Sequence, residues 1–139
     1  MLSMEEISDR LEIQQLLIDY STAIDRRRFD DLDRVFTPDA YIDYTVFGGI
    51  AGSYPEVKAW LAEVLPNFPV YAHMLGNVDV RIDGDTASSR TICFNPMVLP
   101  GDGKQVMFCG LWYVDEFVRT PEGWRMSRRV EEKCFDKVV

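Results

Sequence analysis

The separation of helical and strand patterns along the sequence constrains the fold of this chain most. Apolar residues recur at three- and four-residue spacing over residues 5–24, which predicts an amphipathic helix. A shorter helical pattern covers residues 32–36 and stops before Thr37-Pro38, because proline disfavours helix in the residue that precedes it. A third helix is predicted from Ser53, with Pro55 in its first turn, and it ends before Pro66.

Strand patterns dominate the rest of the chain. One strand is predicted over residues 40–47, among the helices, and four more over residues 73–82, 86–98, 105–118 and 124–135. Glycine-containing turns at residues 83–85, 100–103 and 120–123 separate the last four, which predicts an antiparallel meander. Helices segregated from strands indicate an α+β fold, in which a curved antiparallel sheet wraps around the N-terminal helices. Such a sheet encloses a cavity suited to a small ligand.

Length and charge exclude several classes of protein. The chain has 139 residues, so we expect one domain over residues 1–139. Its net charge is −8. Nucleic acid and anionic membranes are poor partners for so acidic a chain, and no apolar run approaches the ~20 residues of a membrane helix. The acidic N-terminus does not resemble a signal peptide, so we expect a cytoplasmic protein. Three well-separated cysteines, Cys93, Cys109 and Cys134, are expected to be buried reduced thiols.

The single histidine, His73, is the first candidate for chemistry. Taken by position alone, a lone histidine at the start of a strand is more often a structural hydrogen-bond donor. Imidazole nevertheless has an ordinary pKa of ~6.5, which suits a general base near neutral pH. Asp25, at the end of the first predicted helix, could orient such a base and stabilise the imidazolium, or it could be a solvated helix-end residue.

Three further side chains could act on an anion. Tyr20 lies on the apolar stripe of the first helix, and Tyr44 shares a strand face with apolar neighbours, so both are either core residues or neutral hydrogen-bond donors. Alternation along the last strand requires one of Arg128 and Arg129 to face the inside of the sheet, where it needs a carboxylate, an anion or a leaving group.

These residues occur in a familiar arrangement. The segments Tyr20-x4-Asp25, Phe36-Thr-Pro-Asp-Ala-x-Ile-Asp-Tyr44, Ala72-His73-Met-Leu-Gly-Asn and Gly-Trp124-Arg-Met-Ser-Arg-Arg129 resemble the SnoaL-like branch of the nuclear transport factor two-like superfamily. The likeness spans nearly the whole chain and implies a cone-shaped α+β barrel. The most similar patterns are those of scytalone dehydratase, bile-acid 7α-dehydratase and hexachlorocyclohexane dehydrochlorinase. This resemblance implies a cofactor-free lyase that forms a homotrimer, with a dimer as the alternative.

The resemblance assigns roles to particular residues. It implies that Asp25 and His73 form the general-base dyad and that Tyr20, Tyr44 and Arg129 complete the catalytic set. Ile24 stands where scytalone dehydratase has a second tyrosine, so the resemblance does not extend to a named substrate. The two residues of the dyad do match the family pattern. The apolar lining is predicted to favour a small cyclic substrate of low polarity; it comprises Trp60, Phe68, Phe94, Met97, Phe108 and Trp112.

No metal, flavin or nucleotide signature occurs, so we expect no cofactor and no metal. Two alternatives to the lyase stay open at this point. In a ketosteroid-isomerase-like reaction, Asp43 would shuttle the proton while Tyr20 polarises a carbonyl. In a non-catalytic role, the domain would bind a ligand or serve as the small subunit of a larger assembly.

Overall fold

The computed structural model describes residues 1–139 as two α-helices, three short 3₁₀-helices and one six-stranded sheet. The α-helices are α1 (Met4–Asp25) and α2 (Tyr54–Val64), and the 3₁₀-helices cover Phe29–Arg34, Thr45–Phe47 and Leu65–Asn67. The strands are β1 (Phe36–Asp43), β2 (Ala51–Ser53), β3 (Met74–Asp83), β4 (Thr86–Val98), β5 (Val106–Thr120) and β6 (Gly123–Val138). No helix of the chain has the length and apolar character needed to cross a membrane.

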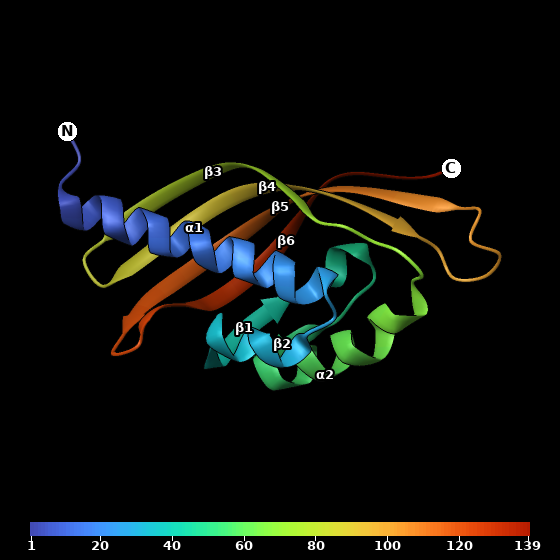
Figure 1. Cartoon of the computed structure of the whole chain (residues 1–139), viewed down its shortest axis with the longest axis horizontal. Coiled ribbons are helices and arrows are strands. Elements are labelled where there is room, and N and C mark those ends of the chain that lie inside the picture. Colours follow the sequence, from blue (N-terminus) through green and yellow to red (C-terminus); the bar gives the residue numbers. More distant parts are fainter.

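The sheet confirms the predicted α+β class and the predicted meander. Strands β3, β4, β5 and β6 pair antiparallel in sequence order. The sheet is mixed, however, because β1 lies parallel to β6 on one side and antiparallel to β2 on the other. Figure 1 shows α1 lying along one face of the long strands, while α2, β1 and β2 lie together below the C-terminal part of α1.

The predicted boundaries fail between α1 and α2. The pattern at residues 32–36 forms a 3₁₀-helix that ends at Arg34, and β1 begins at Phe36, four residues earlier than predicted. Pro38 is tolerated in β1 because the pairing with β6 is irregular between Phe36 and Tyr41, where a missing N–H costs little. The strand predicted over residues 40–47 ends at Asp43, and the short β2 was not predicted.

Helix α1 begins with a capping box. The Ser3 hydroxyl accepts from the Glu6 backbone N–H, and the Glu6 carboxylate accepts from the Ser3 backbone N–H. The buried face of α1 consists mainly of Ile13, Leu16, Leu17, Tyr20 and Ile24. Ile7 and Leu11, expected on the same apolar stripe, are exposed, because Asp9 is the buried residue in that part of the helix.

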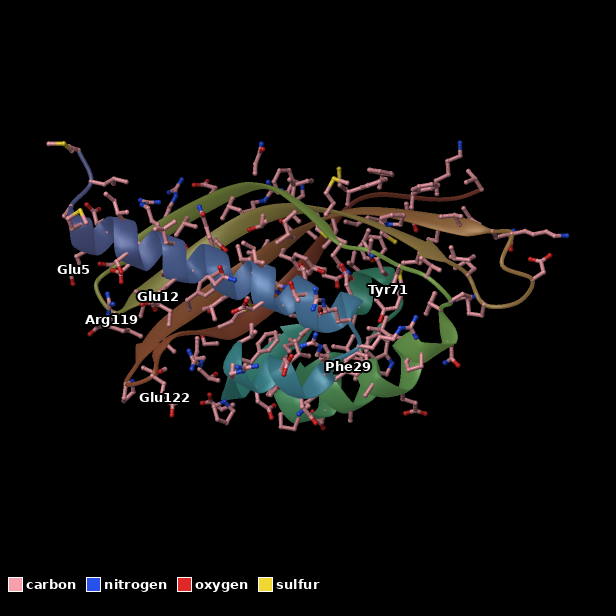
Figure 2. The ribbon with its side chains drawn as sticks, in the orientation of Figure 1. Glu5, Glu12, Phe29, Tyr71, Arg119 and Glu122 are labelled. Carbon is pink, nitrogen blue, oxygen red and sulfur yellow. The ribbon has the colours of Figure 1, made fainter.

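Asp9 is buried because it has strong partners. It accepts two hydrogen bonds from the Arg119 guanidinium, at 2.8 and 2.9 Å, and one from the Trp124 indole at 2.9 Å. These bonds to Arg119 and Trp124 hold the pKa of Asp9 below its usual range. Figure 2 shows Arg119 near the N-terminal half of α1 and Tyr71 toward its other end, so this cluster lies far from the site described next.

Candidate active site

A cavity of about 240 Å³ opens between the inner face of the sheet, the C-terminal half of α1 and helix α2. Fourteen of its 19 lining residues are hydrophobic. The side chains in the lining that can donate or accept hydrogen bonds through nitrogen or oxygen are those of His73, Glu131, Asn95 and three tyrosines. The cavity is slightly smaller than the ~300 Å³ at which ligand pockets usually begin, so its size suits a ligand of one or two rings.

Asp25 and His73 form a hydrogen-bonded pair at the edge of this cavity. The His73 ring nitrogen Nδ1 lies 2.6 Å from Asp25 Oδ1, and the His73 backbone N–H donates to Asp25 Oδ2 at 3.0 Å. The carboxylate accepts at both oxygens, so it fixes the imidazole in place and favours the tautomer with the proton on Nδ1. The other ring nitrogen, Nε2, has no partner in the protein and carries the lone pair that a base needs.

The segment just before His73 is anchored to both α1 and β4. The Asn95 side chain donates to the Ala72 carbonyl at 2.8 Å, and the Tyr71 hydroxyl donates to the Ile24 carbonyl, near the end of α1, at 2.9 Å. Tyr71 also forms an isolated β-bridge with Met97 in β4. These contacts connect α1, β4 and the histidine segment, which keeps the imidazole at a fixed distance from Asp25.

The dyad also reaches a second, shallower depression on the outside of the molecule. Asp25, His73, Ser21 and Thr22 line it, together with Ile18, Arg26 and Leu75. His73 is the residue common to this depression and the cavity. A proton taken up by the imidazole from the cavity therefore has a short route to solvent.

Tyr20 and Tyr44 meet in the cavity. Their hydroxyl oxygens lie 2.5 Å apart, and either one can be the donor. In such a pair one proton is used between the two oxygens and the other proton remains free for an acceptor in the cavity. Burial raises the pKa of Tyr20 to about 12, against the opposing charge of Arg129, and raises the pKa of Tyr44 well above its usual value. Both hydroxyls are therefore neutral donors near pH 7.

Arg129 is the arginine that faces inward, and Arg128 is exposed. The guanidinium does not line the cavity: Nε and Nη2 each donate to the Asp115 carboxylate at 2.8 Å, and the residue is 1% exposed. It lies over the Tyr20 ring at 4.2 Å and the Tyr113 ring at 3.7 Å. Burial opposes its charge, but the Asp115 carboxylate outweighs that and holds the pKa of Arg129 well above its usual range. Its charge lowers the pKa values of Tyr20, Tyr44 and Glu131, against the larger effect of burial on each.

Three of the six predicted lining residues reach the cavity: Trp60, Phe68 and Met97. The prediction is wrong for Phe94, Phe108 and Trp112, because side chains alternate along a strand and these three project from the outer face of the sheet. Cys93, Asn95 and Met97 of β4 alternate with Phe94, and Cys109, Leu111 and Tyr113 of β5 alternate with Phe108 and Trp112. Outside, Phe94 stacks on Phe108 and Phe135, while Arg90 covers Trp112.

Several other titratable groups take clear places. Cys93 and Cys109 are buried and free as expected, but Cys134 is exposed, at the point where the pairing of β6 with β5 skips a residue between Lys133 and Phe135. Burial raises the pKa of Cys93 to about 12 and that of Cys109 to about 11, so neither is a thiolate at neutral pH. No group of three or more His, Cys, Asp or Glu side chains is arranged to hold a metal ion.

Asp43, the base of the isomerase alternative, does not line the cavity. Its carboxylate instead accepts from the Thr45 hydroxyl at 2.6 Å and the Thr45 backbone N–H at 2.9 Å, which lowers the pKa of Asp43. The cavity carboxyl is Glu131, which sequence reasoning missed. Alternation could have found it, because Glu131 is two residues beyond Arg129 on the same face of β6.

Comparison with known proteins agrees with this architecture. A protein of Mycobacterium tuberculosis is 76% identical over 139 residues, which is all of this chain and 95% of that protein. A Kribbella flavida protein of known structure is 28% identical with a TM-score of 0.85, covering 94% of this chain and 93% of the other. Hexachlorocyclohexane dehydrochlorinase from Novosphingobium barchaimii shares the fold at 21% identity, with a TM-score of 0.82 and coverage of 96% and 91%.

The family model of the SnoaL-like domain matches residues 5–130. That range runs from the first turn of α1 to the middle of β6 and so contains nearly all of the cavity and the dyad. The family resemblance expected from the motifs is therefore confirmed, and the chain belongs to the SnoaL-like domain family.

Proposed function

We propose that this protein is a cofactor-free lyase that eliminates water or a similar small leaving group from a small cyclic, largely apolar substrate. The observation that carries the proposal is the Asp25–His73 pair, with its second imidazole nitrogen left free beside an apolar cavity. A histidine with a purely structural role has no need of a carboxylate that accepts from both its ring and its backbone.

The reaction would begin with a carbon acid. Nε2 of His73 removes a proton from a carbon next to a carbonyl group, and Asp25 stabilises the imidazolium that forms. The free proton of the Tyr20–Tyr44 pair is donated to the carbonyl oxygen as it becomes an enolate. The electron pair then forms the new double bond as the leaving group departs from the adjacent carbon.

Burial and charge support this division of roles. The tyrosine pair is buried in an apolar setting, where a hydrogen bond to a developing anion is stronger than in water. The Arg129 cation behind the Tyr20 ring lowers the pKa of that phenol against the larger effect of burial, which makes it a better donor. General-base catalysis contributes ~10²–10⁴-fold, and an oriented donor contributes a comparable factor.

The experiment that tests the proposal follows proton abstraction alone. Cyclohexanone, 1-indanone and 2-tetralone are incubated with the protein in D₂O, and loss of the α-proton signal is followed by NMR. We expect wild type to accelerate exchange of at least one ketone, and His73→Gln and Asp25→Asn to reduce that rate by ~10²-fold or more. Asp19→Asn, at an exposed position of the same helix, is the matched control and should exchange like wild type.

Two other results would overturn the lyase. Exchange with none of the ketones, combined with their measurable binding, would favour the ligand-binding role instead. Exchange that survives His73→Gln would remove the imidazole from the mechanism and favour a carboxylate as the base, as in the isomerase alternative.

We further propose that the chain forms a homo-oligomer, with a trimer expected from the family resemblance. The outer face of the sheet supports this, because stacked Phe94, Phe108 and Phe135 leave apolar surface there and Phe135 is 47% exposed. Light scattering on the purified protein tests it, and a monomer at micromolar concentration would contradict it.

A further inference from the structure

Glu131 is the acidic side chain of the cavity that the proposed reaction leaves without a role. It lies in the middle of β6, opposite Tyr113 of β5, and it faces the same side of the sheet as Arg129. No hydrogen bond or ion pair joins its carboxyl to any other group of the protein, whereas Asp25 and Asp115 are both tightly bonded. A carboxyl placed in a cavity without a protein partner is free to bond to what the cavity holds.

The surroundings of Glu131 disfavour its charge. Burial raises the pKa of Glu131 to about 7, the Arg129 cation opposes that shift, and the Asp43 carboxylate adds to it. The Glu131 charge in turn raises the pKa values of five phenols and thiols around the cavity. They belong to Tyr20, Tyr44, Tyr113, Cys93 and Cys109. His73 is the remaining titratable group that lines the cavity. Near neutral pH a large share of the protein therefore carries a protonated Glu131.

We propose that Glu131 is the general acid that protonates the leaving oxygen when this site eliminates water. This inference rests on the proposed lyase function and names the leaving group of that same site. The cavity then holds a base and an acid as separate residues, His73 for the carbon and Glu131 for the oxygen.

His73 takes the α-proton, and the C–H electron pair becomes the new C=C bond. The bond from the β-carbon to oxygen breaks as the Glu131 proton passes to that oxygen, and water leaves. Glu131 is then a carboxylate and His73 an imidazolium, and one proton returned through solvent from the imidazolium to the carboxylate restores both groups. The net change is loss of one water.

The need for an acid distinguishes hydroxyl from other leaving groups. Hydroxide is too basic to depart readily from an enolate without a proton, whereas acetate departs without one. A carboxyl with a pKa near the working pH is well matched to this task, because it is both substantially protonated and able to give the proton up.

The test compares two leaving groups on one ring system. 3-Hydroxy-1-tetralone and 3-acetoxy-1-tetralone both give 1-naphthol by elimination, which is followed by its fluorescence. We expect Glu131→Gln to slow loss of water by ~10²-fold or more and loss of acetate by less than tenfold. In wild type, water loss alone should fall as pH rises through about 7. Glu132→Gln, next along β6 and exposed, is the matched control.

The outcomes separate this inference from the proposed function. Equal effects of Glu131→Gln on both leaving groups, or no effect on either, would overturn the role of Glu131. Wild type that exchanges 2-tetralone but does not turn over the hydroxy ketone would also overturn it and leave the general-base function standing. Wild type that exchanges no ketone at all would refute the lyase itself, before Glu131 is tested.

Discussion

Replacing Glu131 by glutamine should stabilise the protein at alkaline pH and change its stability little at acid pH. The carboxyl has an ordinary pKa of 4.5, and burial in the cavity raises it to about 7 in the folded protein. Because the folded state holds this proton more tightly than the unfolded state, the associated stability is full below about pH 4.5 and is lost as pH rises through about 7. Glutamine has the same shape and no charge to bury, so the variant avoids that loss.

The size of the effect follows from the two values. Their difference of roughly 2.5 units corresponds to about 3.4 kcal/mol at about 1.36 kcal/mol per unit, which is an upper limit. Water that enters the cavity shields part of the charge, so we expect about 1–3 kcal/mol at pH 8.5. This is a large fraction of the ~5–15 kcal/mol by which a domain of this kind is stable.

Urea unfolding of wild type and Glu131→Gln at pH 5 and pH 8.5 measures this difference. The free energy of unfolding of the variant should exceed that of wild type at pH 8.5, and the difference should shrink to below about 1 kcal/mol at pH 5. Glu132→Gln should follow wild type at both pH values, because that side chain is exposed on the outer face. A Glu131→Gln variant that is no more stable than wild type at pH 8.5 would refute the placement of this carboxyl in a desolvating cavity.

Three further results are expected. Asp9→Asn should lower the free energy of unfolding by about 1–3 kcal/mol at pH 7, measured by urea unfolding, because Arg119 loses a two-point charged partner; an unchanged midpoint would contradict this. Tyr44→Phe and Tyr20→Phe should each slow ketone exchange by about tenfold, and the double variant by ~10²–10³-fold, since either hydroxyl alone can still donate; full activity of the double variant would contradict it. Phe135→Lys should shift the oligomer toward monomer in light scattering without loss of helical circular dichroism, and an unchanged mass would contradict the proposed interface.

Sequence reasoning succeeded where the signal was periodic. The long helix and the four-strand meander follow from repeated apolar spacing and glycine turns, and β4 has the bounds that were predicted. It failed over residues 29–53, where short elements depend on tertiary pairing: β1 accommodates Pro38 only because its register with β6 is irregular there.

The candidate site was predictable in part for a similar reason. His73 and Asp25 were found because one is the sole histidine and the other ends a helix in a recognisable motif, and they are paired in the structure. The aromatic lining was chosen by residue type instead of by strand alternation. Phe94 and Met97, three residues apart on one regular strand, cannot both face the cavity, and only Met97 does.

Glu131 was missed because the candidate residues were chosen by residue type and not by the face of the strand on which they lie. Charged residues of the last strand were considered only as partners for an anion, so a carboxyl on the inner face was not sought. Its ionisation depends on the depth of the cavity and on the distance to Arg129, which no sequence pattern encodes.

The proposed reaction requires Asp25 to hold His73 with its Nε2 lone pair facing the cavity. The most direct test is ¹⁵N NMR of the neutral imidazole, which is unambiguous because the chain has one histidine. We predict a single tautomer with the proton on Nδ1 in wild type, lost or mixed in Asp25→Asn. A proton on Nε2 in wild type, or a tautomer that is indifferent to Asp25→Asn, would contradict the general-base account.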